Sequence, residues 1–406
     1  MTVKRIVYAD NAATTPLRPG ALGAMMPYLT GEFGNPSSMY SYAKTAKEAL
    51  DKARHQIAAA LNAPRDRDVY FTSGGSEGDN WVFKGTADVL AKKGKHIITT
   101  AIEHHAILNI CHWLSEHGYE VTYLPVDKMG RVDPATVEKA IRPDTILISV
   151  MLANNEIGTI EPVKEIAKIA HAHGIWMHTD AVQAVGHIPV DVQDLDVDFL
   201  TLAGHKFGGP KGIGAVYMKK GTRLTPLIHG GGQERGSRGG TENVAGAVGM
   251  GAALTEAVNT MPAEEKRLRV LEKKLRQAIL EKIPYCHLWG DPENRMPGTN
   301  LFTFSGIEGE SIILALDNAG ICASSGSACS SASLEPSHVL SAIGLTEPRE
   351  TSHGSVRLTL GYQNTEEDVD YIIATLPGIV ARLRDMSPIW DDFVKSEETK
   401  KTKEVA

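Results

Sequence analysis

The sequence predicts an α/β protein with a mostly parallel sheet that helices cover on both faces. Short apolar runs rich in β-branched residues alternate with segments of helical periodicity, which is the pattern of strand–helix–strand crossovers. The composition, with 42% hydrophobic and 22% charged residues, is that of an ordinary globular chain and excludes a disordered or fibrous one. At about 100 to 200 residues per domain, the 406 residues suffice for a large domain and a smaller one.

Buried strands and crossover helices are expected along the first part of the chain. The predicted strands are residues 96–100, 121–124, 145–151, 175–179, 199–202 and 213–217. Residues 162–173 predict a crossover helix, because Val163, Ile166 and Ala170 share one face and Gly174 can end the helix in the left-handed conformation. In open sheets of this kind, ligands bind at the carboxyl ends of the strands.

The later part of the chain has a different pattern. Residues 262–283 place Leu268, Leu271 and Leu275 in one apolar stripe on an otherwise charged helix, which predicts a helix between two domains. A second mixed α/β region follows as far as residue 383. Residues 322–333 are small and polar, which favours a loop, and residues 395–406 are too polar to pack.

The net charge and the number of cysteines indicate which cellular compartment and which classes of partner the protein can have. Forty-two basic residues against 49 acidic ones give a net charge of −7, which argues against direct nucleic-acid binding. Four cysteines are too few for a disulfide scaffold and favour a reducing compartment. No apolar run approaches the roughly 20 residues needed to cross a membrane, and the first residues lack the apolar stretch of a signal peptide. We therefore expect a cytoplasmic protein without membrane contact.

Two strand ends carry candidate cofactor ligands. Lys206 and His205 lie in a glycine-rich turn after strand 199–202, where a desolvated lysine can form a Schiff base, although loop lysines are mostly solvated. Asp180 ends strand 175–179 and Gln183 follows it. Asp180 is either the cap of the next helix or the carboxylate that keeps a pyridine nitrogen protonated, and the two roles are compatible.

Gly75 and Ser76 follow an apolar strand and open a helical pattern, so backbone N–H groups there can bind a phosphate. The same residues also fit an ordinary turn. No Gly-Lys-Ser/Thr motif follows, and the pair Gly212 and Gly214 lacks the third glycine of a dinucleotide fingerprint, so nicotinamide binding ranks low.

Histidine and cysteine residues give further candidates. His104 and His105 match no common zinc spacing, and no metal site is predicted; one of them is expected to stack on or protonate a ligand. Cys329 lies among small residues, where it is either a mobile reactive thiol or simply another small residue. Arg357, within an alternating strand, either binds a substrate carboxylate or forms a structural salt bridge.

Several ordered motifs together resemble the cysteine desulfurases of the NifS and IscS type, which are pyridoxal-phosphate enzymes of the aspartate-aminotransferase fold (fold type I). The motifs are residues 8–16, 154–158, 324–336 and Arg357, so the resemblance spans nearly the whole chain. It implies a large cofactor-binding domain at 15–258 and a smaller α/β domain from 1–14 and 259–388. It also implies a mobile cysteine loop at about 322–335 and a charged tail at 389–406, which we expect to be disordered.

The resemblance also implies roles for individual residues. Lys206 would carry pyridoxal 5'-phosphate, Asp180 would pair with its ring nitrogen, and Gln183 would face its phenolic oxygen. His104 would stack on the ring and move protons. Phosphate positions match Gly75, Ser76 and His205, and Thr241 would reach the phosphate of the neighbouring subunit in a homodimer. Ser76 replaces the family's usual threonine, and Ala203 replaces a frequent serine, which removes one hydrogen bond to the phosphate.

The implied reaction converts L-cysteine to L-alanine, with Asn155 and Arg357 holding the substrate carboxylate and Cys329 receiving the sulfur as a persulfide. His104 is the candidate base for a thiol. The acceptor would be a protein such as an iron–sulfur cluster scaffold. A selenocysteine lyase or another aminotransferase would keep Lys206 and Asp180, so these activities stay open. A non-catalytic assembly protein on the same fold is a remote alternative.

Overall fold

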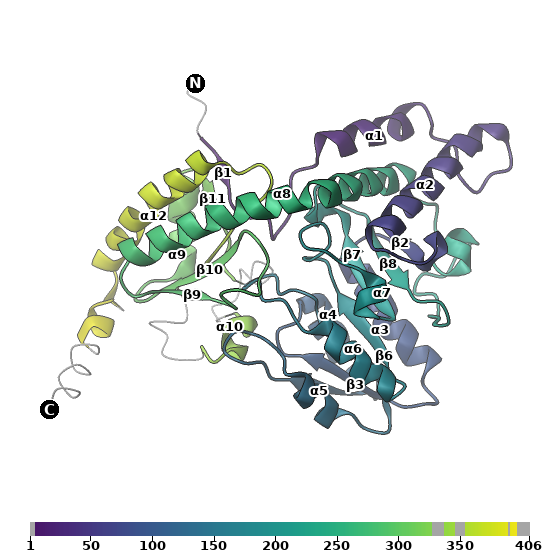
Figure 1. The fold of residues 1–406 in the computed structure, drawn as a ribbon, viewed down its shortest axis with the longest axis horizontal. Coiled ribbons are helices and arrows are strands. Elements are labelled where there is room, and N and C mark those ends of the chain that lie inside the picture. Colours follow the sequence, from purple (N-terminus) through teal and green to yellow (C-terminus); the bar gives the residue numbers. More distant parts are fainter. Residues whose placement is uncertain (1–4, 327–336, 346–353, 389, 396–406) are drawn as a thin grey trace.

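The computed structural model describes residues 5–326, 337–345, 354–388 and 390–395. Two bodies are visible, and the long helix α8 (Val244–Lys282) runs from one to the other (Figure 1). Cys329 and residues 396–406 of the predicted tail lie outside the described residues. Residues 390–395 are helical and Phe393 is buried, so the expectation of a disordered tail from residue 389 is wrong for this part, because its aromatic side chains pack on the second body. Within the described part of the chain, no helix is long and apolar enough to cross a membrane.

The first body is built on a seven-stranded sheet with the order β2-β8-β7-β6-β5-β3-β4. Its strands are β2 (Val69–Thr72), β3 (His96–Thr100), β4 (Glu120–Leu124), β5 (Thr145–Ser149), β6 (Trp176–Asp180), β7 (Phe199–Ala203) and β8 (Gly214–Met218). Strand β8 is antiparallel to both of its neighbours, whereas the pairs from β7 to β4 are parallel. The mostly parallel sheet predicted from the alternating pattern is therefore confirmed, with strand ends shifted by one or two residues.

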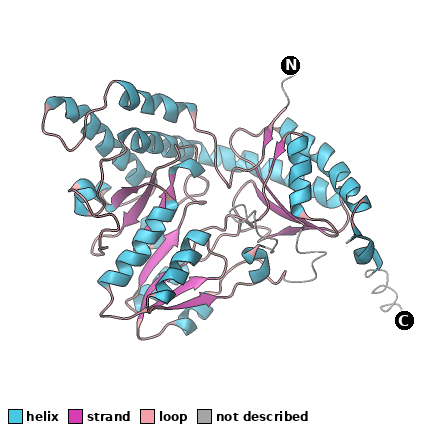
Figure 2. Cartoon of the chain, turned by 180° about the vertical axis from the view of Figure 1, so that it is seen from behind, coloured by secondary structure: helices cyan, strands magenta, loops and turns pink. Residues whose placement is uncertain are grey.

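Helices connect the strands and cover the sheet (Figure 2). They are α3 (Gly75–Val89), α4 (His105–Glu116), α5 (Pro134–Ala140), α6 (Val163–Ala172) and the short α7 (Val192–Leu195). Helix α6 matches the predicted crossover helix, and Gly174 after it has a φ of 66°, the left-handed conformation that glycine adopts without a steric cost.

Helix α8 is longer than the predicted helix at 262–283, because it begins at Val244 and continues through Pro262. Proline is typical of a first helical turn, so the sequence pattern placed the start too late. The earlier half packs against α1 (Pro19–Thr30) and α2 (Lys44–Ala60). A Cβ at Gly251 would lie 3.1 Å from the Cα of Ala53 in α2, so glycine permits this close approach.

The second body has its own sheets and core. The sheets are β12 (Ser355–Thr359)-β10 (Thr299–Phe304)-β9 (Cys286–Trp289), antiparallel, and β1 (Val7–Tyr8)-β11 (Ile321–Cys322), parallel. The helices are α9 (Gly309–Asn318), α10 (His338–Ala342) and α12 (Glu366–Asp385). One hydrophobic core joins Val7, Leu275 of α8 and Phe302, apart from the core under the seven-stranded sheet. The predicted division into 15–258 and 1–14 with 259–388 stays a prediction, which the two cores support.

Candidate functional site

A cavity of about 230 Å³ lies at the carboxyl ends of β6 and β7, beside the N-terminus of α3. Its lining brings together eight of the predicted site residues: Gly75, Ser76, His104, Asn155, Asp180, Gln183, His205 and Lys206. The fold places them there because the strands that precede them are parallel and end at one edge of the sheet.

A second cavity of about 220 Å³ shares Ala13, His104, Asn155, Gln183 and Lys206 with the first and adds Arg357. The two cavities therefore form adjoining chambers with Lys206 between them. Thr241 is not part of either lining; it lies in a separate cavity of about 70 Å³.

Lys206 ends the short 3₁₀ helix Gly204–Lys206 directly after β7. Its ammonium nitrogen donates to the backbone carbonyls of Ala12 and Ala13, at 3.0 Å for Ala13. Gln183 also donates to the Ala12 carbonyl, at 2.9 Å. The N-terminal segment therefore orients both side chains toward the shared chamber, a contact that sequence pattern alone did not reveal.

Asp180 is the last residue of β6, and only 5% of its surface is exposed. Its Oδ1 accepts a hydrogen bond of 2.9 Å from the Val182 N–H, but a turn follows and the next helix begins at Val192, so the predicted helix-capping role is wrong. Burial raises the pKa of this carboxyl, and the Val182 hydrogen bond and the Lys206 charge oppose that rise. A protonated ring nitrogen is the kind of partner that such a buried carboxylate requires.

The end of the cavity that is predicted to bind a phosphate is made by the first turn of α3, which begins at Gly75. A Cβ at Gly75 would lie 2.8 Å from Cγ2 of Val182, and one at Gly78 would lie 2.7 Å from Cγ2 of Thr201, so glycines let the helix approach the sheet closely. Ala203 lines the same cavity without a hydroxyl. Thr201 does not replace the missing hydroxyl, because its Oγ1 is bonded to His178 at 3.0 Å.

His104 is the N-cap of α4, and its Nδ1 accepts a hydrogen bond of 3.1 Å from the Ala106 N–H. We therefore assign the ring proton to Nε2. Burial, together with the Lys206 charge, lowers the pKa of His104 to about 4, so the ring is neutral at pH 7. A base would need the Nδ1 lone pair, which the cap already uses. The geometry thus favours a stacking and hydrogen-donating role over the predicted role as base.

His205 also lines the cavity, and its Nδ1 is 3.1 Å from Oγ1 of Thr14. Burial and the neighbouring Lys206 and Lys211 charges lower the pKa of His205 to about 4. Its ring is therefore neutral at pH 7 and can contribute a hydrogen bond to a phosphate but no charge.

Arg357 lies on β12, where both predicted roles have structural support. Nη2 pairs with Oδ1 of Asp10 at 3.0 Å, and Nη1 donates to the backbone carbonyl of Asn155 at 3.0 Å. Its Nε is buried and has no hydrogen-bond partner among the described residues. The guanidinium is therefore fixed at the edge of the second chamber, which its side chain lines.

The sequence reasoning missed the polar residues Asp79 and His338, which line the chambers, whereas His105, one of its two histidine candidates, lines the second chamber. Asp79 lies one helical turn after Gly75, so its spacing from the predicted phosphate turn was an available signal. His338 comes from α10 in the second body, and its Nε2 donates to the Glu103 carbonyl at 2.9 Å. No local pattern connects two segments that far apart.

The residues present fit pyridoxal phosphate. The first turn of α3 offers N–H groups to a phosphate, Asp180 offers a buried carboxylate to a ring nitrogen, and Lys206 offers an amine between the chambers. The chemistry of these donors therefore agrees with the cofactor that the sequence resemblance implies.

Comparison with known proteins gives consistent results. The Aminotransferase class-V family model matches residues 7–372. Cysteine desulfurase IscS of Clostridium botulinum (strain Hall) is 52% identical over 396 residues, covering 97% of this chain and 99% of the relative. A solved NifS-like protein is 37% identical with a TM-score of 0.87, covering 93% of this chain and all of that one. The structure of SspA in complex with cysteine is 38% identical with a TM-score of 0.75, covering 87% and 98%.

Proposed function

The chain belongs to the aminotransferase class-V family of pyridoxal-phosphate enzymes, and from that premise we propose that it is a cysteine desulfurase. In this proposal it converts L-cysteine to L-alanine and transfers the sulfur to an enzyme thiol as a persulfide. The observation that carries the proposal is the pair of adjoining chambers, with Lys206 lining both and Arg357 lining only the second. Relatives and solved structures named as cysteine desulfurases or bound to cysteine support it.

In the first chamber, the predicted site residues would bind different parts of the cofactor. Lys206 would hold it covalently, and Asp180 would pair with its ring nitrogen. Gln183 would face the phenolic oxygen, and His104 would lie against the ring. Its phosphate would bind at Gly75, Ser76 and His205. When bound, the cofactor withdraws electrons from the substrate Cα and so makes its proton acidic.

In the second chamber, Arg357 and Asn155 would orient the substrate carboxylate. Asp10 and the Asn155 carbonyl fix the guanidinium, so little side-chain entropy remains to be lost on binding. The Lys206 amine is the candidate acceptor for the Cα proton, because it lines both chambers.

Sulfur transfer is proposed to use Cys329, which lies outside the described residues. Its thiolate attacks the substrate sulfur, so that a sulfur–sulfur bond forms while the Cβ–Sγ bond breaks. The electron pair of the broken bond stays with the substrate, Cβ takes up a proton, and the product leaves as alanine. A thiol with an ordinary pKa of about 8.5 is only a few per cent ionised at pH 7, so a base must assist. The helix cap at His104 leaves that base unassigned.

Replacing Cys329 by serine tests the proposal. We expect the variant to bind the cofactor and to show absorbance changes with L-cysteine, but to form almost no alanine in steady state. The measurement is alanine and sulfide released by the cofactor-loaded protein with a reductant, beside the parent. Equal turnover by the two proteins would refute persulfide formation at Cys329. No alanine from a yellow parent would instead redirect the search to selenocysteine or to amino-group transfer.

We further propose a homodimer in which Thr241 binds the phosphate of the neighbouring subunit. Its separate position, away from the cofactor chamber of its own chain, supports this role. So does a run of exposed apolar side chains on α1 and after it, which marks an interaction surface. These side chains are Leu22, Met26, Leu29, Phe33, Met39 and Tyr40.

Replacing Thr241 by alanine is expected to weaken cofactor binding by about 10-fold, since a hydrogen bond to a charged group contributes about 1.5 to 3 kcal/mol. Titration of the apoprotein with the cofactor measures this change, and Thr241→Ser should restore most of the affinity. A monomeric parent in light scattering, or an unchanged affinity in Thr241→Ala, would contradict the shared site. The cytoplasmic location and a sulfur acceptor such as an iron–sulfur scaffold stay predictions.

A further inference from the structure

Two buried carboxyls line the first chamber. Asp79 of α3 is 1% exposed and Asp180 of β6 is 5% exposed. Lys206 is the only lysine or arginine among the described residues that line this chamber. One cation cannot neutralise two carboxylates, and a cofactor phosphate adds further negative charge nearby. A buried charge without a partner is costly, so the site favours a single ionised carboxyl.

Among the described residues, the surroundings of Asp79 supply no second cation. Its Oδ1 lies 3.7 Å from Nε2 of His178 and has no hydrogen-bond partner among the described residues. His178 is fully buried between two hydroxyls, with Nδ1 2.8 Å from Oγ of Ser149 and Nε2 3.0 Å from Oγ1 of Thr201. Burial lowers the pKa of His178 to about 3, so the imidazole is neutral and does not offset an Asp79 charge.

We propose that Asp79 is a positioning residue that keeps its proton, so that Asp180 is the single carboxylate of the chamber and is the one that faces the ring nitrogen of the cofactor. The inference rests on the proposed function only for the identity of that ring. Asp79 thus acts through Asp180 and need not touch the substrate. When two carboxyl groups are buried close together, one of them can stay protonated so that only the other carries a negative charge.

The charges around Asp79 act in the same direction. Burial raises the pKa of Asp79 most and the Asp180 carboxyl raises it next, while the Thr201 hydrogen bond lowers it and Glu103 has the smallest, raising effect. Burial also raises the pKa of Glu103 to about 8, so that group adds little charge at pH 7. The pKa of Asp79 is higher in the folded protein than in the unfolded chain. As the pH rises between these two pKa values, the unfolded chain releases the proton while the folded protein keeps it, so Asp79 makes the folded state less stable.

The test compares two isosteric replacements, Asp79→Asn and Asp180→Asn, in the full-length protein. Asp79→Asn mimics the neutral acid, so we expect the apoprotein to melt on the order of 2 °C higher at pH 8. That gain should shrink as the pH falls toward about 4, where the unfolded carboxyl titrates. The loaded variant should keep the long-wavelength cofactor band. Asp180→Asn should lose most of that band at the same pH, because its ring nitrogen has no anionic partner.

Infrared spectroscopy gives a direct second measurement. Glu103 is also protonated at pH 7 and gives a C=O band in every variant, so the measurement is the difference spectrum. The parent apoprotein should show an additional protonated-carboxyl C=O band that persists in Asp180→Asn and is lost in Asp79→Asn. A lower melting temperature for Asp79→Asn at pH 8, or loss of the cofactor band as large as in Asp180→Asn, would show that Asp79 is ionised and would overturn the inference. If Asp79→Asn does not fold, absence of the band from the parent would also overturn it. The melting and infrared results do not depend on desulfurase activity, so the two proposals fail separately.

Discussion

Replacing Lys206 by alanine is expected to reduce alanine formation from L-cysteine by at least about 10⁴-fold, the upper range for loss of a single proton-transfer group. The loss should be this large because the same amine is proposed to hold the cofactor and to accept the Cα proton. Its position between the two chambers, fixed by the carbonyls of Ala12 and Ala13, supports both roles. Steady-state alanine release and the absorbance of the purified protein measure the change.

Two variants serve as controls for Lys206→Ala. Lys206→Arg keeps the positive charge but cannot form the covalent bond, so its activity should be as low as that of the alanine variant. Lys211 lies on the same glycine-rich turn and is exposed, and Lys211→Ala should change turnover by less than about twofold. Substantial turnover by Lys206→Arg would show that the charge alone is needed and would remove the covalent role.

The local sequence pattern was sufficient to predict the site residues that lie at the ends of the parallel strands. Asp180 and Lys206 each follow a buried strand, and parallel strands end at one edge, so their convergence follows from the fold class. The helix N-terminus at Gly75 was found for the same reason. The pattern offered the cofactor roles of these residues beside structural alternatives, and the sequence resemblance favoured the cofactor roles.

The rest of the site depends on contacts between distant segments, which no local pattern encodes. Asp10 pairs with Arg357 across 347 positions, and Ala12 binds Gln183 through a backbone carbonyl that any residue could supply. The state of His104 follows from a helix cap and from burial, both of which require coordinates. Pro262 gave a false helix start, because proline is favoured in a first turn and here lies within α8.

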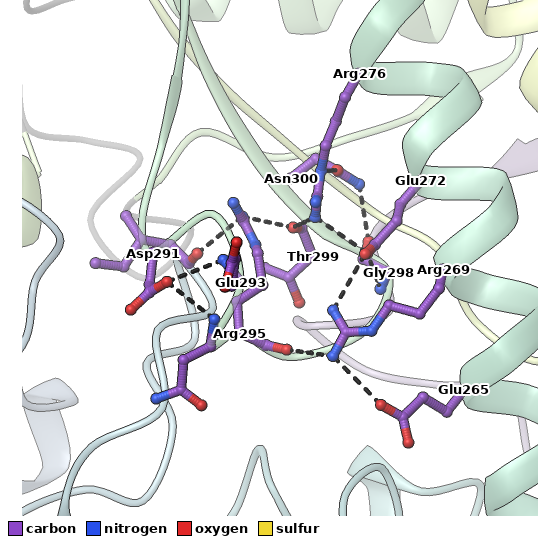
Figure 3. Close-up of polar contacts among 12 residues, drawn as sticks. Glu265, Arg269, Glu272, Arg276, Asp291, Glu293, Arg295, Gly298, Thr299 and Asn300 are labelled. Carbon is purple, nitrogen blue, oxygen red and sulfur yellow. Dashed lines mark hydrogen bonds and ion pairs between the residues drawn. The ribbon is translucent and has the colours of Figure 1, made fainter.

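A polar network joins α8 to the segment 291–300 of the second body (Figure 3). Glu272 lies at its centre and is 3% exposed. It accepts hydrogen bonds from Arg269 at 3.1 Å and from the Gly298 N–H at 2.6 Å, and it pairs with Arg276 at 3.1 Å. The backbone carbonyl of Arg295 accepts a hydrogen bond from Arg269 at 2.7 Å.

Arg295 extends this network toward the substrate chamber. It is buried and donates through Nη2 to the carbonyls of Ile157 and Thr299, at 3.0 and 2.7 Å. Burial, with the nearby Arg276 charge, lowers the pKa of Arg295 to about 9, while Glu272 opposes that shift. Glu272 is thus the carboxylate that several closely spaced guanidinium groups share. Arg295 links it to Ile157, which is two residues from Asn155 in the substrate chamber.

Replacing Glu272 by alanine is therefore expected to destabilise the protein by about 3 kcal/mol, the lower range for leaving a buried ion pair without one partner. The loss combines an uncompensated Arg276, which is mostly buried, with an unpaired Gly298 N–H. Urea unfolding followed by circular dichroism measures the change, with the slope compared between variants because two cores need not unfold together. The Michaelis constant for cysteine should also rise, since the turn at Asn155 loses part of its support.

Glu265 provides a matched control for Glu272, because both carboxylates contact Arg269 from the same helix. The Glu265 side chain is 38% exposed against 4% for Glu272, and its contact with Arg269 is longer, at 3.4 Å. Solvent screens such a pair, so Glu265→Gln should cost less than about 0.5 kcal/mol and leave the Michaelis constant unchanged. Similar losses of unfolding free energy for the two variants would mean that the burial of a carboxylate does not determine how much it stabilises this network. A loss below about 1 kcal/mol for Glu272→Ala would mean that water reaches Arg276 once the carboxylate is removed.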